Sequence, residues 1–181
     1  TQGYSSAASD VYKRQVFVSG HKSPDTDSIA AALSYSYLKR RLGMDAVAVR
    51  AGEINKESRF ALDYFNLEEP ILVTSVERKN PEDEKQKVIL VDHNESKQTI
   101  DGMDDAEVLE IIDHHRFGDF ESENPIFILV RPVGCVNTVI YGLYKTNHIK
   151  PSREIAGIML SAIISDTVLF LSLIHISEPT R

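Results

Sequence analysis

The stretch VFVSGHKSPDTDSIAAALSYSYLK, residues 16–39, joins an apolar run to an amphipathic segment through a short polar turn. The apolar run predicts a buried strand, and the helical spacing of apolar residues over 28–42 predicts a helix that stops at a glycine. His21, Asp25 and Asp27 lie between these two elements. Carboxylates this close together repel each other unless a positive charge lies between them. The stretch therefore predicts a strand, a helix and a metal site at their junction.

The rest of the chain continues this alternation of strand and helix patterns. Further strands are predicted at 46–52, 87–92, 105–113 and 126–134, and further helices at 56–67, 137–147 and 152–167. The strands are almost continuously apolar, as in parallel sheets that are buried on both faces. The fold class predicted is therefore α/β, with a mostly parallel sheet and helices on both faces.

Length and charge limit the other possibilities. The 181 residues suffice for one sizeable domain. The net charge of −7 argues against nucleic acid as a partner. A single cysteine, Cys135, excludes an internal disulfide and favours a reducing compartment. The apolar stretches are too short to span a bilayer, and the N-terminus lacks a signal-peptide core. We expect a cytoplasmic, soluble protein with no membrane partner.

The domain that follows the pattern runs from 16 to 170. Residues 1–15 are polar and unpatterned, and the pattern also ends in the last segment, LSLIHISEPTR. We expect both tails, 1–15 and 171–181, to lie outside the natural domain. The polar stretch 77–87 predicts a charged surface loop.

Four segments place acidic or imidazole side chains at or near the end of an element: GHKSPDTDS, ILVDHNE, EIIDHHRF and AIISDTVLF. The carboxyl ends of parallel strands lie along one edge of a sheet, where ligands bind. The side chains that can meet there are His21, Asp25, Asp27, Asp92, His93, Asp113, His114, His115 and Asp166.

This mixture of ligand types predicts the kind of metal. Carboxylate oxygen with imidazole nitrogen suits Mn²⁺, Fe²⁺, Co²⁺ or Zn²⁺ better than Ca²⁺. With so many ligands, two ions bridged by one carboxylate are more plausible than a single ion. Each segment alone has a simpler interpretation. Asp27 or Ser28 could cap the helix, and the DHH triplet could be an exposed strand end.

Other signals are weaker. There is no phosphate-binding P-loop, no dinucleotide fingerprint and no nucleophile elbow. The segment PVGCVNT, 132–138, could offer backbone N–H groups to an anion, or could be a plain turn with Asn137 or Thr138 as the cap. Cys135 fits a small buried side chain better than a nucleophile. His148 is expected at the surface.

The motifs GHKSPDTDSI, ILVDHNE, IDHHR, PVGC and SAIISDT, in this order and spacing, resemble the N-terminal domain of manganese-dependent (family II) inorganic pyrophosphatases. These enzymes belong to the DHH phosphoesterase superfamily. The triplet DHH is shared with many phosphoesterases, whereas its combination with HKSPDTDS and DHNE is much narrower. The resemblance covers about 16–170.

The resemblance implies a set of roles. It implies that His21 and Asp25 hold one metal, that Asp27, His114 and Asp166 hold the other, and that Asp92 bridges them. Asp92 and His115 are then the catalytic residues. Asp92 bridges the two metals, and His115 contacts the substrate phosphate. His93 and Asp113 would orient these groups. The implied cofactors are two Mn²⁺ ions, with Co²⁺ possible, and Mg²⁺ with the substrate. The implied reaction is hydrolysis of pyrophosphate to two phosphates by a metal-bridging water.

The resemblance also implies a homodimer formed through this domain. Members of the family continue after the SDT motif into a second, substrate-binding domain with basic side chains. Here position 171 is leucine, and we expect that C-terminal domain to be absent, which leaves turnover by this chain in question. Two alternatives stay open: another DHH phosphoesterase acting on oligonucleotides or cyclic dinucleotides, and a metal-binding module without catalysis.

Overall fold

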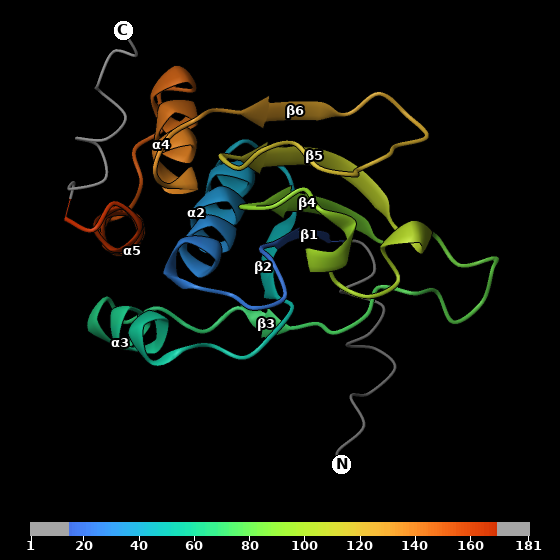
Figure 1. Ribbon diagram of the computed structural model, residues 1–181, viewed down its shortest axis with the longest axis horizontal. Coiled ribbons are helices and arrows are strands. Elements are labelled where there is room, and N and C mark those ends of the chain that lie inside the picture. The colour runs from blue at the N-terminus through green and yellow to red at the C-terminus, as the bar shows by residue number, and fades with distance from the viewer. Residues whose placement is uncertain (1–14, 170–181) are drawn as a thin grey trace, which may run out of the picture.

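A computed structural model describes residues 15–169 of the chain. Its centre is a six-stranded sheet in the order β3-β2-β1-β4-β5-β6, and every neighbouring pair is parallel. Figure 1 shows the strands stacked in this order, from β6 at the top to β3 at the bottom. The strands are β1 (Val16–Ser19), β2 (Ala46–Arg50), β3 (Ile71–Leu72), β4 (Lys87–Val91), β5 (Glu107–Asp113) and β6 (Phe127–Val130).

All four predicted helices are present, and two short 3-10 helices lie in the connections. The helices are α2 (Thr26–Arg41), α3 (Lys56–Tyr64), α4 (Val136–Thr146) and α5 (Arg153–Asp166), with η1 (Ser96–Gln98) and η2 (Met103–Asp105). Helix α2 begins at Thr26, earlier than predicted, because the Asp25 side chain caps it by accepting from the Ser28 N–H at 2.9 Å. The sequence pattern missed β3 and both 3-10 helices, which are too short to show a period.

The two faces of the sheet are covered differently. Alternate strand residues such as Val18 and Ile89 pack against α2, α4 and α5. The residues between them, such as Phe17 and Leu90, pack against connecting segments that include Ile100 of the β4–β5 connection. The α/β class and the parallel sheet are confirmed, but the second face carries 3-10 helices and loops where we expected α-helices. Because the connections are right-handed, the segments that follow β1 and β2 lie on one face, and those that follow β4 and β5 lie on the other. The segments after β4 and β5 are short and polar, so they form no packed α-helix.

This topology creates the place for a site. From β1 the chain moves outward to β2 and β3, then returns to the other side of β1 as β4. Such a reversal of direction leaves a crevice at the carboxyl ends of the two central strands, where ligands bind in open α/β sheets. We call this side of the sheet the metal edge. His21 and Asp92 follow the two strands that meet there.

Two smaller expectations concern the surface. The stretch 77–87 forms no helix or strand before β4 begins, and most of its residues are exposed, as predicted. Arg78 in this loop donates to Asp105 at 2.7 Å and so ties it to η2. No helix in the described part of the chain has the length and apolar character to cross a membrane. The tails, apart from Gln15, and Phe170 lie outside the described residues.

Candidate metal centre

The predicted segments meet at the metal edge, where the potential ligand atoms form three groups: His21, Asp25 and Asp92; Asp92, Asp113, His114 and His115; and Asp27, Cys135 and Asp166. We divide the expected ligands among them into an outer and an inner cluster. The outer cluster consists of His21, Asp25 and Asp92, whose potential ligand atoms lie within 4.8 Å of one another. The Nε2 atom of His21 is 3.7 Å from an oxygen of Asp25 and 3.5 Å from Oδ2 of Asp92. An ion placed among these three atoms would have two carboxylates and an imidazole within reach.

The loop after β1 shapes the outer cluster. The backbone N–H of His21 donates to the Ser28 hydroxyl at 3.0 Å, which folds the loop back onto the first turn of α2. A side chain at Gly20 would meet that hydroxyl, since an added Cβ would lie 1.8 Å from it. Glycine is therefore required for the close approach that brings His21 toward Asp25, and Asp25 is itself fixed as the cap of α2.

The inner cluster consists of Asp27, His114 and Asp166. The Nε2 atom of His114 is 3.7 Å from Asp27 Oδ2. Asp27 and Asp166 share a side-chain hydrogen bond, and their ligand atoms group with the Cys135 thiol. The three residues come from the start of α2, the end of β5 and the end of α5, so the inner cluster depends on tertiary packing.

Asp27 also holds the N-terminus of α4. Its buried carboxylate accepts from the N–H groups of Val136 at 2.7 Å and Asn137 at 3.2 Å, from the Asn137 amide at 2.6 Å and from the Cys135 thiol at 2.9 Å. The residue at the N-cap position, Cys135, makes no side-chain capping bond. The sequence allowed two interpretations of the segment PVGCVNT, a site for an anion or a turn capped by Asn137 or Thr138, and neither is complete. The anion at this helix N-terminus is the chain's own Asp27, which satisfies the helix dipole and its free donors.

Asp92 lies between the two clusters. Its Oδ2 faces His21, while its Oδ1 lies 3.2 Å from the Nε2 atom of His114. The residue is only 2% exposed, and its backbone has a φ of 65°, in the left-handed region that costs free energy for a residue with a side chain. This conformation turns one carboxylate toward both clusters, which is the geometry expected of a bridging ligand.

The histidines share an arrangement typical of metal sites. The Nδ1 atom of His114 lies 2.8 Å from the Val133 carbonyl, and that of His93 lies 2.9 Å from the Val91 carbonyl. Carbonyl oxygens only accept, so Nδ1 carries a proton in each ring, and Nε2 is the nitrogen that a metal ion would bind after displacing any proton there. Among the residues that the structure describes, His93 Nε2 is the one buried side-chain nitrogen or oxygen atom that has no hydrogen-bond partner.

The protonation of the clusters shows how strongly they attract positive charge. Burial alone would lower the pKa of His21, but hydrogen bonds to Asp25 and Asp92 raise it to about 10. Burial opposes the charged form of His114 too, yet the contact with Asp92 raises its pKa to about 9. Burial and the hydrogen bond with Asp27 raise the pKa of Asp166 to about 9. Protons therefore occupy the clusters where a cation would otherwise lie.

These observations fit a divalent metal. Carboxylates and neutral imidazoles are suitable ligands for Mn²⁺ and Co²⁺. Burial and the nearby Asp27 carboxylate raise the pKa of Cys135, so its sulfur stays a thiol and acts as a hydrogen-bond donor. The absence of a thiolate argues against a structural zinc site.

The structure brings all nine predicted site residues to the metal edge, although not all in the same way. His115 stands at the rim with a side chain 53% exposed, and its Nδ1 atom contacts Asp113 at 2.9 Å. Asp113 is engaged by neighbouring donors, as an orienting residue would be. His148 is exposed, as expected. No sequence pattern indicated a role for Asn94, a buried side chain that contacts Asp113.

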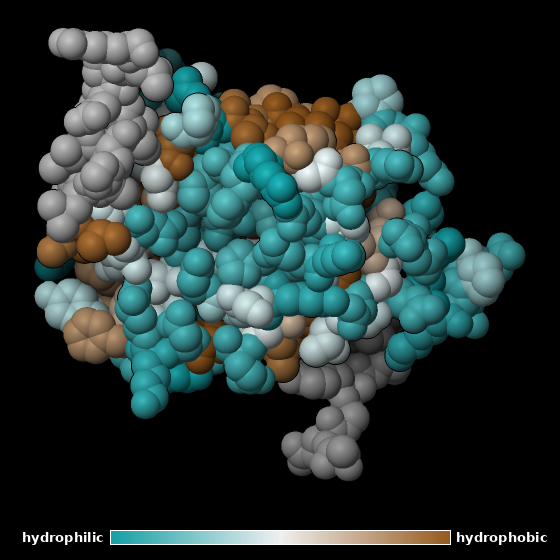
Figure 2. All heavy atoms as spheres, in the orientation of Figure 1, coloured by the Kyte–Doolittle hydropathy of each residue, from teal (hydrophilic) through white to brown (hydrophobic). Residues whose placement is uncertain are grey.

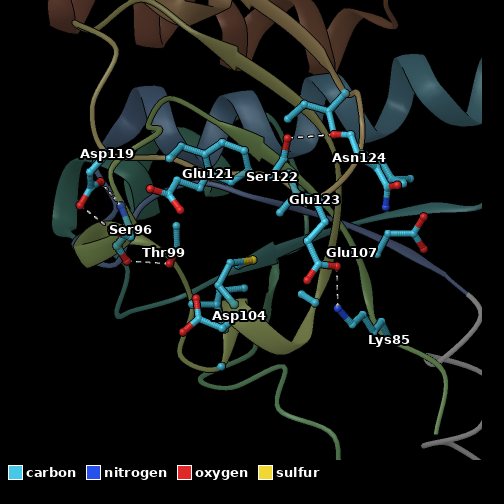
Figure 3. A pocket seen from close by; sticks show the side chains of 18 of the residues that line it. Lys85, Ser96, Thr99, Asp104, Glu107, Asp119, Glu121, Ser122, Glu123 and Asn124 are labelled. Carbon is cyan, nitrogen blue, oxygen red and sulfur yellow. Dashed lines mark hydrogen bonds and ion pairs between the residues drawn. The ribbon is translucent and has the colours of Figure 1, made fainter.

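A large cavity lies elsewhere. It measures about 820 Å³ and is lined mainly by the segments 96–109 and 119–126, on the face that lacks α-helices. Figure 3 shows acidic side chains around it, including Asp104, Glu107 and Glu121. No member of the outer or inner cluster lines this cavity. The metal edge, where the expected ligands meet, therefore remains the candidate functional site.

Comparisons with known proteins show the family of the chain. A family model described as the DHH family, N-terminal domain, matches residues 15–163. The chain is 50% identical over 157 residues to a protein of Exiguobacterium named "Probable manganese-dependent inorganic pyrophosphatase", covering 87% of this chain and 49% of the relative. A Bacillus licheniformis protein of the same name is 51% identical over 158 residues, with 87% and 50% covered. The chain thus spans about half the length of the curated relatives it matches.

Solved structures give the same picture. The crystal structure of a "putative family II inorganic pyrophosphatase" of Methanococcus jannaschii matches with a TM-score of 0.75 and 40% identity, over 86% of this chain and 50% of that one. An exopolyphosphatase-related protein of Bacteroides fragilis matches with a TM-score of 0.62 and 18% identity, over 87% and 47% of the two chains. The second likeness supports the fold alone.

Proposed function

The chain belongs to the DHH family, and from that premise we propose that it is the metal-binding half of a manganese-dependent inorganic pyrophosphatase. The observation that carries the proposal is the bridging position of Asp92 between two carboxylate–imidazole clusters. Relatives about 50% identical to this chain are named for manganese and pyrophosphate. The proposed reaction is hydrolysis of pyrophosphate to two phosphates.

We propose the following metal-binding role for each residue. His21 and Asp25 serve one ion, Asp27, His114 and Asp166 serve the other, and Asp92 serves both. Two bound Mn²⁺ ions, with Co²⁺ as a possible substitute and Mg²⁺ accompanying the substrate, would supply an activated water and a clamp for the phosphoryl group. The contact of His114 Nδ1 with the Val133 carbonyl keeps the Nε2 atom of this ring directed for binding.

His115 is proposed to meet the substrate itself. Its Nδ1 atom is held by Asp113 at 2.9 Å, and its side chain is half exposed at the rim. The hydrogen bond to Asp113 raises the pKa of His115. The doubly protonated imidazole, which this hydrogen bond favours, can donate from Nε2 to a phosphate oxygen. This leaves binding of the charged substrate as its role, rather than metal ligation.

The test compares two substrates and two forms of the chain. With Mn²⁺ present, phosphate release from pyrophosphate and mononucleotide release from a dinucleotide are measured for the 181-residue chain and for its fusion after Phe170 to the downstream half of the Bacillus licheniformis relative. Asp92→Asn is the control in both forms. We expect strong pyrophosphate hydrolysis by the fusion and slow hydrolysis by the chain alone. The described metal edge consists mainly of carboxylates and imidazoles, and losing one charge-stabilising donor costs on the order of 10²–10³ in rate.

Other outcomes would favour the alternatives. Preference for the dinucleotide would indicate another DHH phosphoesterase. Metal binding without turnover in the fusion would favour a non-catalytic module. Fast pyrophosphate hydrolysis by the chain alone would show that a second, basic domain is dispensable.

We also propose that the chain forms a homodimer through β6. This strand is the edge of the sheet, and Phe127 and Ile128 are 50% and 44% exposed. In Figure 2 an apolar patch lies over the position of β6 at the top of the molecule. An exposed apolar edge strand is a ready site for pairing with another strand. Light scattering at several concentrations tests this, with Phe127→Lys as the variant expected to be monomeric. A monomer at every concentration without the substitution would contradict the dimer.

The remaining proposals concern the surroundings of the protein. A cytoplasmic location fits the single reduced cysteine and the proposed substrate. The net charge of −7 fits a small-molecule substrate better than nucleic acid. Fractionation of the cells that make the protein, and a shift assay with DNA and RNA, would test these two points.

A further inference from the structure

Asn94 lies two residues after Asp92, on the turn that leaves β4, and is 1% exposed. Its side-chain amide donates to Asp113 Oδ2 at 2.5 Å and to the Arg116 carbonyl at 3.0 Å. Its side-chain oxygen accepts from the Gly118 N–H. Both amide protons and the oxygen are therefore used, and all three contacts reach the segment that carries His114 and His115.

Asp113 is the next link. Its buried carboxylate accepts from the backbone N–H groups of His114 at 2.7 Å and His115 at 3.2 Å, and contacts the Nδ1 atom of His115 at 2.9 Å. All three contacts are on Oδ1, while Oδ2 is held by Asn94. A buried carboxylate with one oxygen released could rotate and lose this arrangement. The amide of Asn94 thus fixes the rotation of Asp113.

We propose that Asn94 is a positioning residue that acts through Asp113 to set the orientation of the His115 ring. One amide proton of Asn94 donates to Asp113. The other amide proton and the side-chain oxygen bind the loop that follows His115, so the backbone and the ring of His115 are held together. The part of this inference that concerns phosphate rests on the proposed function, because there His115 meets the substrate.

The local packing favours an amide at this position. A Cβ added to Gly118 would lie 2.7 Å from Glu95 Cγ and 3.1 Å from the Asn94 oxygen, so the loop approaches Asn94 as closely as a glycine allows. Aspartate would fit the space of Asn94 but would place a second carboxylate against Asp113. Asn94→Asp therefore removes the amide donor and adds repulsion with almost no change in volume.

The first experiment observes the ring directly, without turnover. Nitrogen–proton NMR of the metal-free chain reports the proton on His115 Nδ1. We expect its protected signal in the natural sequence and in the control Asn124→Asp, which makes the same charge change at an exposed residue. Asn94→Asp should lose that protection. An unchanged His115 signal in folded Asn94→Asp would overturn the proposal.

The second experiment separates positioning from ligand binding. Calorimetry measures Mn²⁺ affinity and then the affinity of the Mn²⁺-loaded chain for inorganic phosphate. Asn94→Asp should weaken phosphate binding by about 10–100-fold, the usual cost of losing an orienting partner, and change Mn²⁺ affinity by less than about threefold. A loss of Mn²⁺ affinity comparable to that of Asp92→Asn would show that Asn94 supports the ligands instead.

Two further outcomes are informative. If Asn94→Asp does not fold, Asn94→Ser keeps one hydroxyl donor and should show partial protection of the His115 signal. The same signal in Asn94→Ser as in the natural sequence would then overturn the proposal. If the natural chain binds no phosphate while the NMR result holds, the proposed contact of His115 with phosphate is not supported by this chain alone, the fusion assay decides the proposed function, and the positioning role of Asn94 stands.

Discussion

The outer and inner clusters contain the same types of side chain but are built in different ways. In the outer cluster, His21 and Asp25 come from one loop, and the Asp25 side chain is 52% exposed. In the inner cluster, Asp27, His114 and Asp166 come from three separate elements, and Asp27 is fully buried. Asp25 makes one capping hydrogen bond, whereas Asp27 holds the whole N-terminus of α4.

This difference separates two kinds of dependence. Asp25 of the outer cluster can be removed with little disturbance of the packing, because its side chain is half exposed and its structural contribution is the cap of one helix. A ligand in the inner cluster is also a structural support. Metal affinity and stability should therefore respond independently in the outer cluster and together in the inner one. Asp92 belongs to both clusters.

The largest effect is expected for Asp92→Asn. Because one carboxylate faces both His21 and His114, its loss should weaken both Mn²⁺ sites, each by at least the ~10–100-fold typical of lost orienting partners. His21→Ala should weaken only the outer site. Calorimetric titration with Mn²⁺ or Co²⁺ measures both constants. Equal losses at both sites in the two variants would contradict the bridging assignment.

The second prediction concerns stability without metal. Asp27→Ala leaves four buried donors without an acceptor, and we expect it to lower the free energy of unfolding by about 2–3 kcal/mol. Asp25→Ala should cost about 1 kcal/mol, the value of a helix cap. Urea unfolding in EDTA measures both.

A matched control exists for the smaller effect. Asp25→Ser keeps a good cap but removes the ligand, so stability should return while the outer metal site stays weak. Similar destabilisation by Asp25→Ala and Asp27→Ala would show that the two clusters do not differ as described.

The contrast between ligands from one segment and ligands from separate elements also explains which site residues could be predicted from the sequence. His21, Asp25 and Asp27 were evident because they lie within one short segment after a clear strand. His114 could be assigned to the same edge because parallel strands end on one side of a sheet, and Asp166 was added from the end of the last predicted helix. The predicted α/β class follows from apolar strands that alternate with helical patterns, and the structure confirms it.

What the sequence could not predict depends on contacts between distant residues. The capping of α4 by Asp27 joins residues 108 to 110 positions apart. Asn94 has the appearance of an ordinary turn residue, and only the folded chain shows its contact with Asp113. The second face of the sheet was also predicted incorrectly in detail, because a 3-10 helix of three residues has no detectable period.

The third prediction concerns pH. The pKa values of His21 and His114 are raised in the folded chain to about 10 and about 9, above the value near 6.5 in an unfolded chain. Their contribution to stability is therefore full below about pH 6.5 and is lost as pH rises through 9 and 10. Thermal unfolding in EDTA should show stability falling over this range.

Metal binding should reverse that trend, because the ion replaces these protons. The inner cluster holds protons on His114 and on Asp166, whose pKa is about 9, whereas the outer cluster holds one on His21. The inner ion should therefore release more protons than the outer one at pH 7.5. Calorimetry of His21→Ala and of the natural chain, in two buffers of different ionisation enthalpy, gives both counts. Equal proton release would mean that the clusters are electrostatically alike.

The smallest effect is expected for Cys135→Ser, a change inside the inner cluster that removes no proposed ligand. The thiol donates to Asp27 Oδ1 at 2.9 Å and is fully buried. A serine hydroxyl can donate in the same direction, so stability should fall by no more than about 1 kcal/mol. Both Mn²⁺ constants should change by less than about threefold. Cys135→Ala, which lacks the donor, should cost about 1 kcal/mol more, because one oxygen of a buried carboxylate then loses a partner. Urea unfolding and calorimetry of the two variants test this ranking. A large loss of Mn²⁺ affinity in Cys135→Ser alone would show that the sulfur is a ligand, and the inner cluster would then have to be redrawn around it.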